Sequence, residues 1–66
     1  MTVADVKTRV RAIKKMAHDD ESAHSSEDQL REDVLRAIAD GTATDSKQLA
    51  REALKTSDIK FARWCA

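Results

Sequence analysis

The sequence predicts an all-α fold, and three observations support this prediction. The 66 residues include no proline, one glycine and eleven alanines, and 36% of them are Asp, Glu, Lys or Arg. This composition strongly favours helices. Aromatic residues make up only 3% of the chain and β-branched residues are scattered, which disfavours a sheet. Apolar residues also recur at helical spacing. We predict one small domain (1–66): an antiparallel helical hairpin over 3–18 and 21–40, and a C-terminal helical segment over 46–65.

The first helix is predicted over 3–18. Thr2 and Asp5 stand three positions apart at its start, as in a capping box. Its apolar residues follow a 3-4-3-4 spacing, which gives a narrow seam suited to one partner helix. The residues of this seam are Val3, Val6, Val10, Ile13 and Ala17.

The second helix is predicted over 21–40, and Gly41 supplies its left-handed C-cap. Its start has two alternatives. Asp19 or Asp20 could cap a long helix, or Ser25 or Ser26 could cap a shorter one. We favour the long helix, whose apolar face would comprise Ala23, Leu30, Val34, Ala37 and Ile38.

In the long version of this helix, Glu27 lies within the apolar face, which is an unfavourable position for a carboxylate. We therefore expect Glu27 to pair with a basic residue of the first helix, near Arg11 or Lys14.

The C-terminal segment begins with Asp45 and Gln48, which have the spacing of a capping box. A third helix from about 46 to 55 would bury Leu49, Ala50, Ala53 and Leu54. The triplet at 56–58 either interrupts the chain or caps a last helix over 59–65. Whether 46–65 forms one helix or two is left open.

Charge is segregated along the chain, although twelve basic and twelve acidic residues cancel to a net charge of zero. Residues 1–18 are basic, residues 19–41 are acidic and residues 42–66 are mildly basic. Such neighbouring segments indicate elements that pair, within one chain or between chains. One flank of the first helix is the candidate electrostatic partner surface, with Lys7, Arg11, Lys14 and Lys15.

The large apolar residues are few, so the core barely offsets the entropy of ordering the chain. The single cysteine, Cys65, excludes an intrachain disulfide and indicates a reducing compartment. We therefore expect a homodimer or higher oligomer. No apolar run typical of a signal peptide or a membrane span is present, so we expect a soluble cytoplasmic protein without a membrane partner.

Candidate interface residues are the two aromatic residues and the cysteine near the C-terminus, together with the seam of the first helix. They are Phe61, Trp64, Cys65, Val3, Val6, Val10 and Ile13. Trp is favoured at interface hot spots, although both aromatic residues could instead close the end of a small core.

Two alternative functions have some support. Residues 46–65 faintly resemble a helix-turn-helix, in which Lys55, Lys60 and Arg63 would contact DNA, but the turn lacks the usual glycine.

Metal binding ranks third. Glu21, His24 and Asp28 share one helix face, but the first helix offers no glutamate to complete a site. We predict no cofactor. No catalytic constellation is evident, so we expect no enzymatic activity.

Three segments carry a resemblance to known proteins: residues 19–28, residues 34–41 and residues 52–66, the last ending in Phe-Ala-Arg-Trp-Cys-Ala. They resemble short helical proteins encoded by phages of actinobacteria and by prophages in their hosts. The resemblance implies an origin and no active site. We predict a self-associating, phage-encoded accessory protein that acts in the cytoplasm of the host bacterium, with a host protein as a second candidate partner.

Overall fold

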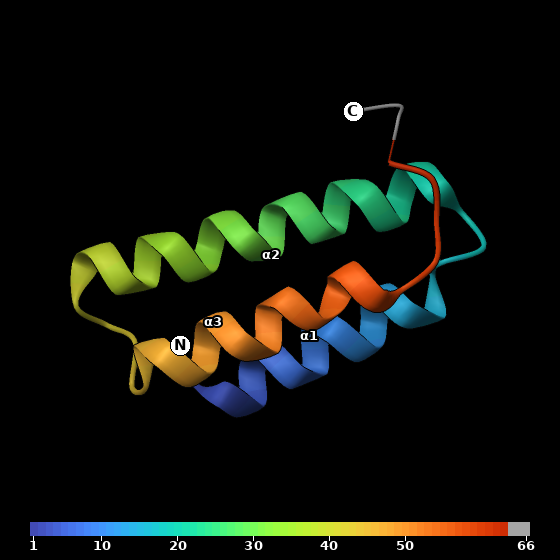
Figure 1. Ribbon diagram of the computed structural model, residues 1–66. Coiled ribbons are helices and arrows are strands. Elements are labelled where there is room, and N and C mark those ends of the chain that lie inside the picture. Colours follow the sequence, from blue (N-terminus) through green and yellow to red (C-terminus); the bar gives the residue numbers. More distant parts are fainter. Residues whose placement is uncertain (64–66) are drawn as a thin grey trace.

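A computed structural model describes residues 1–63 and shows three α-helices followed by a 3-10 turn (Figure 1). No strand occurs in this part of the chain, so the all-α prediction is confirmed. The elements are α1 (Val3–Lys15), α2 (Asp20–Asp40), α3 (Ser46–Leu54) and η1 (Lys55–Asp58).

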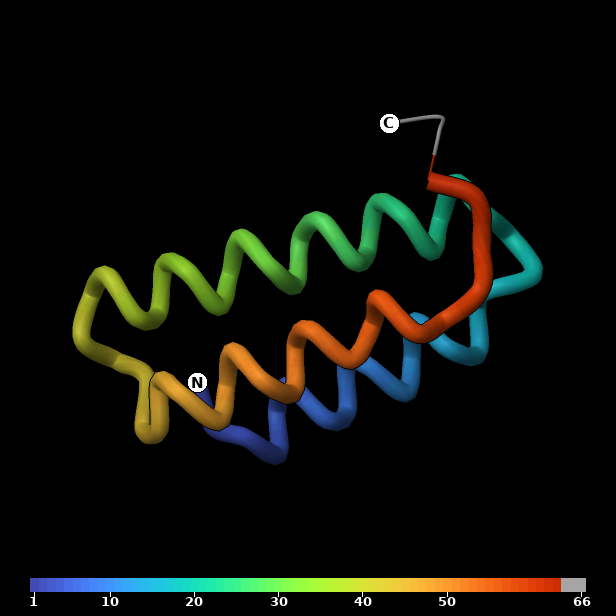
Figure 2. Tube along the Cα trace, in the orientation of Figure 1, coloured from blue at the N-terminus to red at the C-terminus, as the bar shows by residue number. Residues whose placement is uncertain are grey.

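The three helices form an up-down-up bundle in which each helix contacts the other two. α1 and α2 make the expected antiparallel hairpin, and α3 returns alongside α1 beneath α2 (Figure 2). After η1 the chain turns away from α3 and crosses to the start of α2. We call this crossing segment, residues 59–63, the C-terminal strap.

The helix starts follow the local signals in the sequence. Thr2 and Asp5 form the predicted capping box, in which each side chain accepts a hydrogen bond from the backbone N–H of the other residue. Asp19 caps α2 by accepting from the Ser22 N–H, which confirms the long version of this helix. Asp45 likewise accepts from the Gln48 N–H at the start of α3.

Gly41 ends α2 with φ at 75°, in the left-handed region that favours glycine. This is the predicted C-cap.

The predicted end of the first helix is wrong, and so is the prediction of helix after residue 58. α1 ends at Lys15, because Met16 leaves helical geometry and its carbonyl accepts from the Asp19 N–H in a tight turn. The predicted C-terminal helix over 59–65 is absent from residues 59–63. Ile59 is extended, and both it and Phe61 pack against the core while Lys60 between them is exposed. Side chains that alternate in this way between the core and solvent are typical of an extended chain.

The core lies along the axis of the bundle and receives side chains from all three helices. Its members are Val6, Ile13, Ala23, Leu30, Val34, Leu49 and Ala53. Two residues of the predicted seam, Val6 and Ile13, are therefore buried in the core of a single chain, and Val10 packs against it. Leu54 was predicted to be buried and is 61% exposed, because it lies on the solvent side of the contact between α2 and α3.

Candidate functional site

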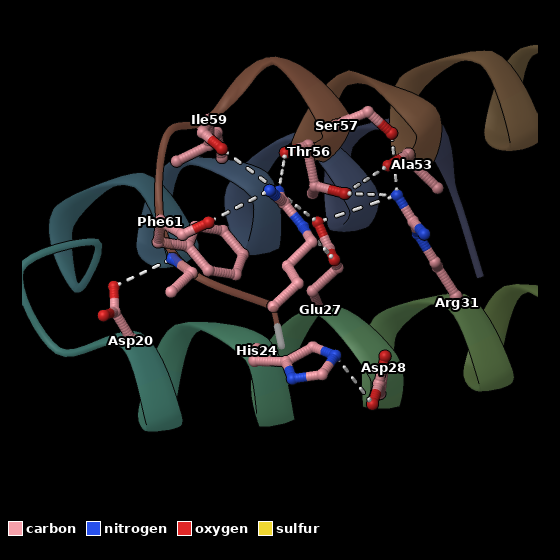
Figure 3. A network of polar contacts seen from close by, with 12 residues as sticks. Asp20, His24, Glu27, Asp28, Arg31, Ala53, Thr56, Ser57, Ile59 and Phe61 are labelled. Atoms are coloured by element: carbon pink, nitrogen blue, oxygen red, sulfur yellow. Dashed lines mark hydrogen bonds and ion pairs between the residues drawn. The ribbon is translucent and has the colours of Figure 1, made fainter. Parts of the chain in front are cut away.

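A buried carboxylate organises the most elaborate polar cluster in residues 1–63 (Figure 3). Glu27 lies on the inner face of α2 and is 1% exposed. Arg63 of the strap binds it in a bidentate manner, with Nε at 2.8 Å from Oε1 and one terminal nitrogen at 2.9 Å from Oε2. Arg31, one turn along α2, adds a longer ion pair at 3.6 Å.

The same terminal nitrogen of Arg63 also donates to the carbonyl oxygens of Thr56, at 2.8 Å, and Ile59, at 3.1 Å. The guanidinium lies over the Phe61 ring, 3.9 Å from its centre. These contacts fix the strap across the end of the bundle. The hydrogen bond from Arg63 is the main cause that lowers the pKa of Glu27, against the opposing effect of burial.

This cluster corrects the prediction that Glu27 pairs with a basic residue of α1. Its main partner, Arg63, is 36 residues away in sequence. Because both oxygens of Glu27 are occupied by a cation, the carboxylate is held ionised and is not available as a general acid. We assign the cluster a structural role.

Of the predicted interface residues near the C-terminus, only Phe61 lies in the part of the chain that the structure describes. Phe61 is half-buried and packs against the core, so it helps to close the end of the bundle. Trp64 and Cys65 lie outside the described residues. Val6 and Ile13 are buried in the core, and Val3 and Val10 are half-buried.

The structure does not bring the candidate DNA-binding residues together on a recognition helix. Residues 59–63 are not helical, so this part of the predicted helix-turn-helix is absent. Arg63 is engaged by Glu27, Lys55 pairs with Glu52 at 2.6 Å, and Lys60 is exposed on the strap.

The weak metal candidates remain on one helix. His24 and Asp28 form an i, i+4 pair at 3.5 Å, and Glu21 is exposed one turn earlier. No group of three or more His, Cys, Asp or Glu side chains able to hold a metal is found between residues 1 and 63.

The cations predicted to form a partner surface do share one face of α1. We call Lys7, Arg11, Lys14 and Lys15 the α1 basic stripe. All four are exposed, and none makes an ion pair within the described part of the chain. Arg9, on the flank of α1 that faces α2, is instead paired with Asp33 at 2.8 Å.

A second surface was not predicted. A shallow apolar groove runs between α2 and α3, and it is lined by Arg31, Val34, Leu35, Ala50, Ala53 and Leu54. Leu35 is 67% exposed and Leu54 is 61% exposed. Helical periodicity alone could not identify this groove, because it depends on which flanks of α2 and α3 meet.

Comparisons with known proteins add no family or relative: the chain matches no protein-family model, and no curated protein or solved structure is detectably similar to it. Among residues 1–63, no helix combines the length and the apolar character needed to cross a membrane.

Proposed function

We propose that this chain is a small, non-enzymatic protein–protein interaction module that associates with a second copy of itself through the groove between α2 and α3. The observation that carries the proposal is the exposure of Leu35 and Leu54, 67% and 61%, on opposite walls of one groove. Two large apolar side chains exposed side by side are typical of an interface.

Burial of the two leucines contributes part of the free energy that a dimer needs. Full burial of a leucine contributes about 2 kcal/mol, so covering two side chains that are roughly two-thirds exposed contributes about 2.5 kcal/mol per subunit. A symmetric interface buries the same two leucines of each subunit, so the four leucines together contribute about 5 kcal/mol. Removing it should weaken dimerisation by about three to four orders of magnitude.

One polar residue of the groove adds a requirement for the partner. Arg31 lines the groove, and its Nε is buried without a hydrogen-bond partner among the described residues. A buried donor of this kind is costly unless it is satisfied. We therefore expect the docked surface to place a carbonyl or carboxylate oxygen near Arg31.

Analytical ultracentrifugation of the wild type and of Leu35→Gln/Leu54→Gln tests the proposal. The wild type should dimerise at or below several hundred micromolar. The double variant should remain monomeric, and circular dichroism checks that it is folded. Ala39→Gln, an exposed change on the same helix, serves as the matched control and should leave the dimer intact. A wild type that stays monomeric at several hundred micromolar would refute self-association.

The biological setting that we propose is that of the resemblance: an accessory protein of an actinobacterial phage in the cytoplasm of its host. In that setting a host protein could compete with the second copy for the groove. Retention of a host protein by the wild type, and not by Leu35→Gln/Leu54→Gln, would identify that partner.

A further inference from the structure

We propose that the α1 basic stripe is a separate binding site for the phosphate backbone of duplex nucleic acid. The stripe lies on a different helix from the groove between α2 and α3, so this inference does not depend on self-association. It also differs from a helix-turn-helix, since it uses one exposed helix face and no recognition helix.

The first argument is the unpaired charge. Arg11, Lys14 and Lys15 line one shallow groove on α1, and Lys7 extends the row by one turn. The only acid of this helix, Asp5, is engaged in the N-terminal capping box. Across the contact with α3, the acid that senses the charge of Lys7 is Glu52. It is 4% exposed and paired with Lys55.

Lys7 is the member of the row whose charge is partly compensated by an acid of the chain, because it is among the causes that lower the pKa of Glu52. The remaining three cations have no such neighbour among the described residues, apart from the hydrogen bond that Arg11 donates to the Thr8 hydroxyl. We therefore count three to four cations available to a ligand.

The second argument separates nucleic acid from an acidic protein. Protein interfaces need a desolvated apolar or aromatic centre within their polar rim. The large apolar side chains that are exposed in residues 1–63 are Leu35, Ile38 and Leu54, and none of them lies on α1. A row of cations without an apolar centre is sufficient for phosphate contacts, which fix position without reading sequence.

The third argument is spacing. Lys7 and Lys15 are eight residues apart, about 12 Å along a helix axis. A duplex carries about seven phosphate charges over the same length. Only part of these phosphates face one side of the duplex, so their number is of the same order as the three to four cations of the stripe.

The test is fluorescence anisotropy of a labelled 20-base-pair DNA duplex of random sequence, titrated with the full chain between 50 and 200 mM salt. Each phosphate contact contributes about 0.9 to the salt slope, so three to four contacts give a slope of about −3 and a loss of about 60-fold in affinity over this range. Arg11→Ala/Lys15→Ala should reduce the slope to about −1.

The matched control is Lys47→Ala/Lys60→Ala, which removes two exposed cations outside α1. It should leave the slope unchanged, and circular dichroism confirms the fold of both variants. Absence of binding at 50 mM salt, or equal losses in the two double variants, would overturn the proposal. So would displacement of the duplex by poly-glutamate at equal charge concentration, because it would make an acidic protein the better occupant.

Discussion

Removing Arg63 should leave Glu27 as a buried and undercompensated charge. Breaking a buried ion pair by deleting one partner costs about 3–5 kcal/mol. We expect Arg63→Ala to lie at the lower end, about 3 kcal/mol. The Arg63 side chain is itself 33% exposed, and Arg31 remains 3.6 Å from the carboxylate. A domain of this size has roughly 3–10 kcal/mol of total stability, so the loss is a large fraction of it.

The two partners should behave asymmetrically. Glu27→Gln removes the charge and keeps an oxygen that can accept from Arg63, while the guanidinium can recover water at its exposed edge. We expect this change to cost only about 1 kcal/mol. Glu27→Gln/Arg63→Ala should then be more stable than Arg63→Ala alone, because it has no buried charge to compensate.

The pH dependence gives a second test with a definite sign. In the wild type the pKa of Glu27 is lowered from its usual value of 4.5, so its stabilising contribution is present above pH 4.5 and is lost as pH falls through the native pKa. In Arg63→Ala the main contact that lowers this pKa is gone and burial remains. The stability difference between the two proteins should therefore shrink from pH 7 to pH 3.

Urea unfolding followed by circular dichroism at 25 °C measures these quantities. Lys60→Ala, an exposed change in the same strap, is the control and should be nearly neutral. Arg63→Lys, expected to cost about 1.5 kcal/mol because it gives up the bidentate geometry, keeps the experiment measurable if the alanine variant unfolds. A loss below 1 kcal/mol for Arg63→Ala, or a greater loss for Glu27→Gln, would refute the reasoning.

Three further predictions concern the helix ends and one surface ion pair. Gly41→Ala should lower the free energy of unfolding by about 1 kcal/mol, measured by thermal unfolding. The cause is the left-handed φ of 75° and not a clash, because an added Cβ would meet no atom within 4 Å. Gly41→Asn should cost less. Asp45→Ala should cost about 1 kcal/mol by removing the N-cap of α3, and Asp45→Ser should restore most of it. The hydrogen bond from Arg9 lowers the pKa of Asp33 from 3.8, so the stability that it provides is present above pH 3.8 and is lost on further acidification; Asp33→Asn should flatten the acid limb of the stability curve.

Features encoded by neighbouring residues could be predicted from the sequence. The Thr2–Asp5 capping box, the Asp19 cap and the Gly41 C-cap each depend on residues within one helical turn, and all three are confirmed. The Asp45 cap forms too, but Gln48 does not complete a reciprocal box. Its side chain donates instead to Glu52.

Features that depend on how the helices meet could not be predicted. The partner of Glu27 is an example: the sequence showed that a carboxylate on the apolar face needs a cation, but several cations were available. The basic residues of α1 were the plausible choice on charge pattern alone. The choice of Arg63 depends on the strap leaving helical geometry after Asp58, which frees the carbonyl of Ile59 to accept from the guanidinium.

The exposed groove has the same origin. Leu54 and Leu35 appear as ordinary apolar positions in a helical pattern, and only the packing of α2 against α3 decides that both remain outside the core. Arg31 connects this groove to the buried cluster, because it lines the groove while donating to the hydroxyls of Thr56 and Ser57.

The charge pattern of the sequence therefore has two separate consequences in the structure. Part of the basic charge is neutralised within the chain, where Arg9 pairs with Asp33 and Arg63 with Glu27, and these pairs connect α2 to α1 and to the strap. The cations of the α1 basic stripe make no ion pair among the described residues and are available for a ligand. A net charge of zero conceals this division, because it sums charges that are paired within the chain with charges that remain unpaired at the surface. The separation of a cationic surface on α1 from an apolar surface between α2 and α3 is the physical reason to expect two different classes of partner.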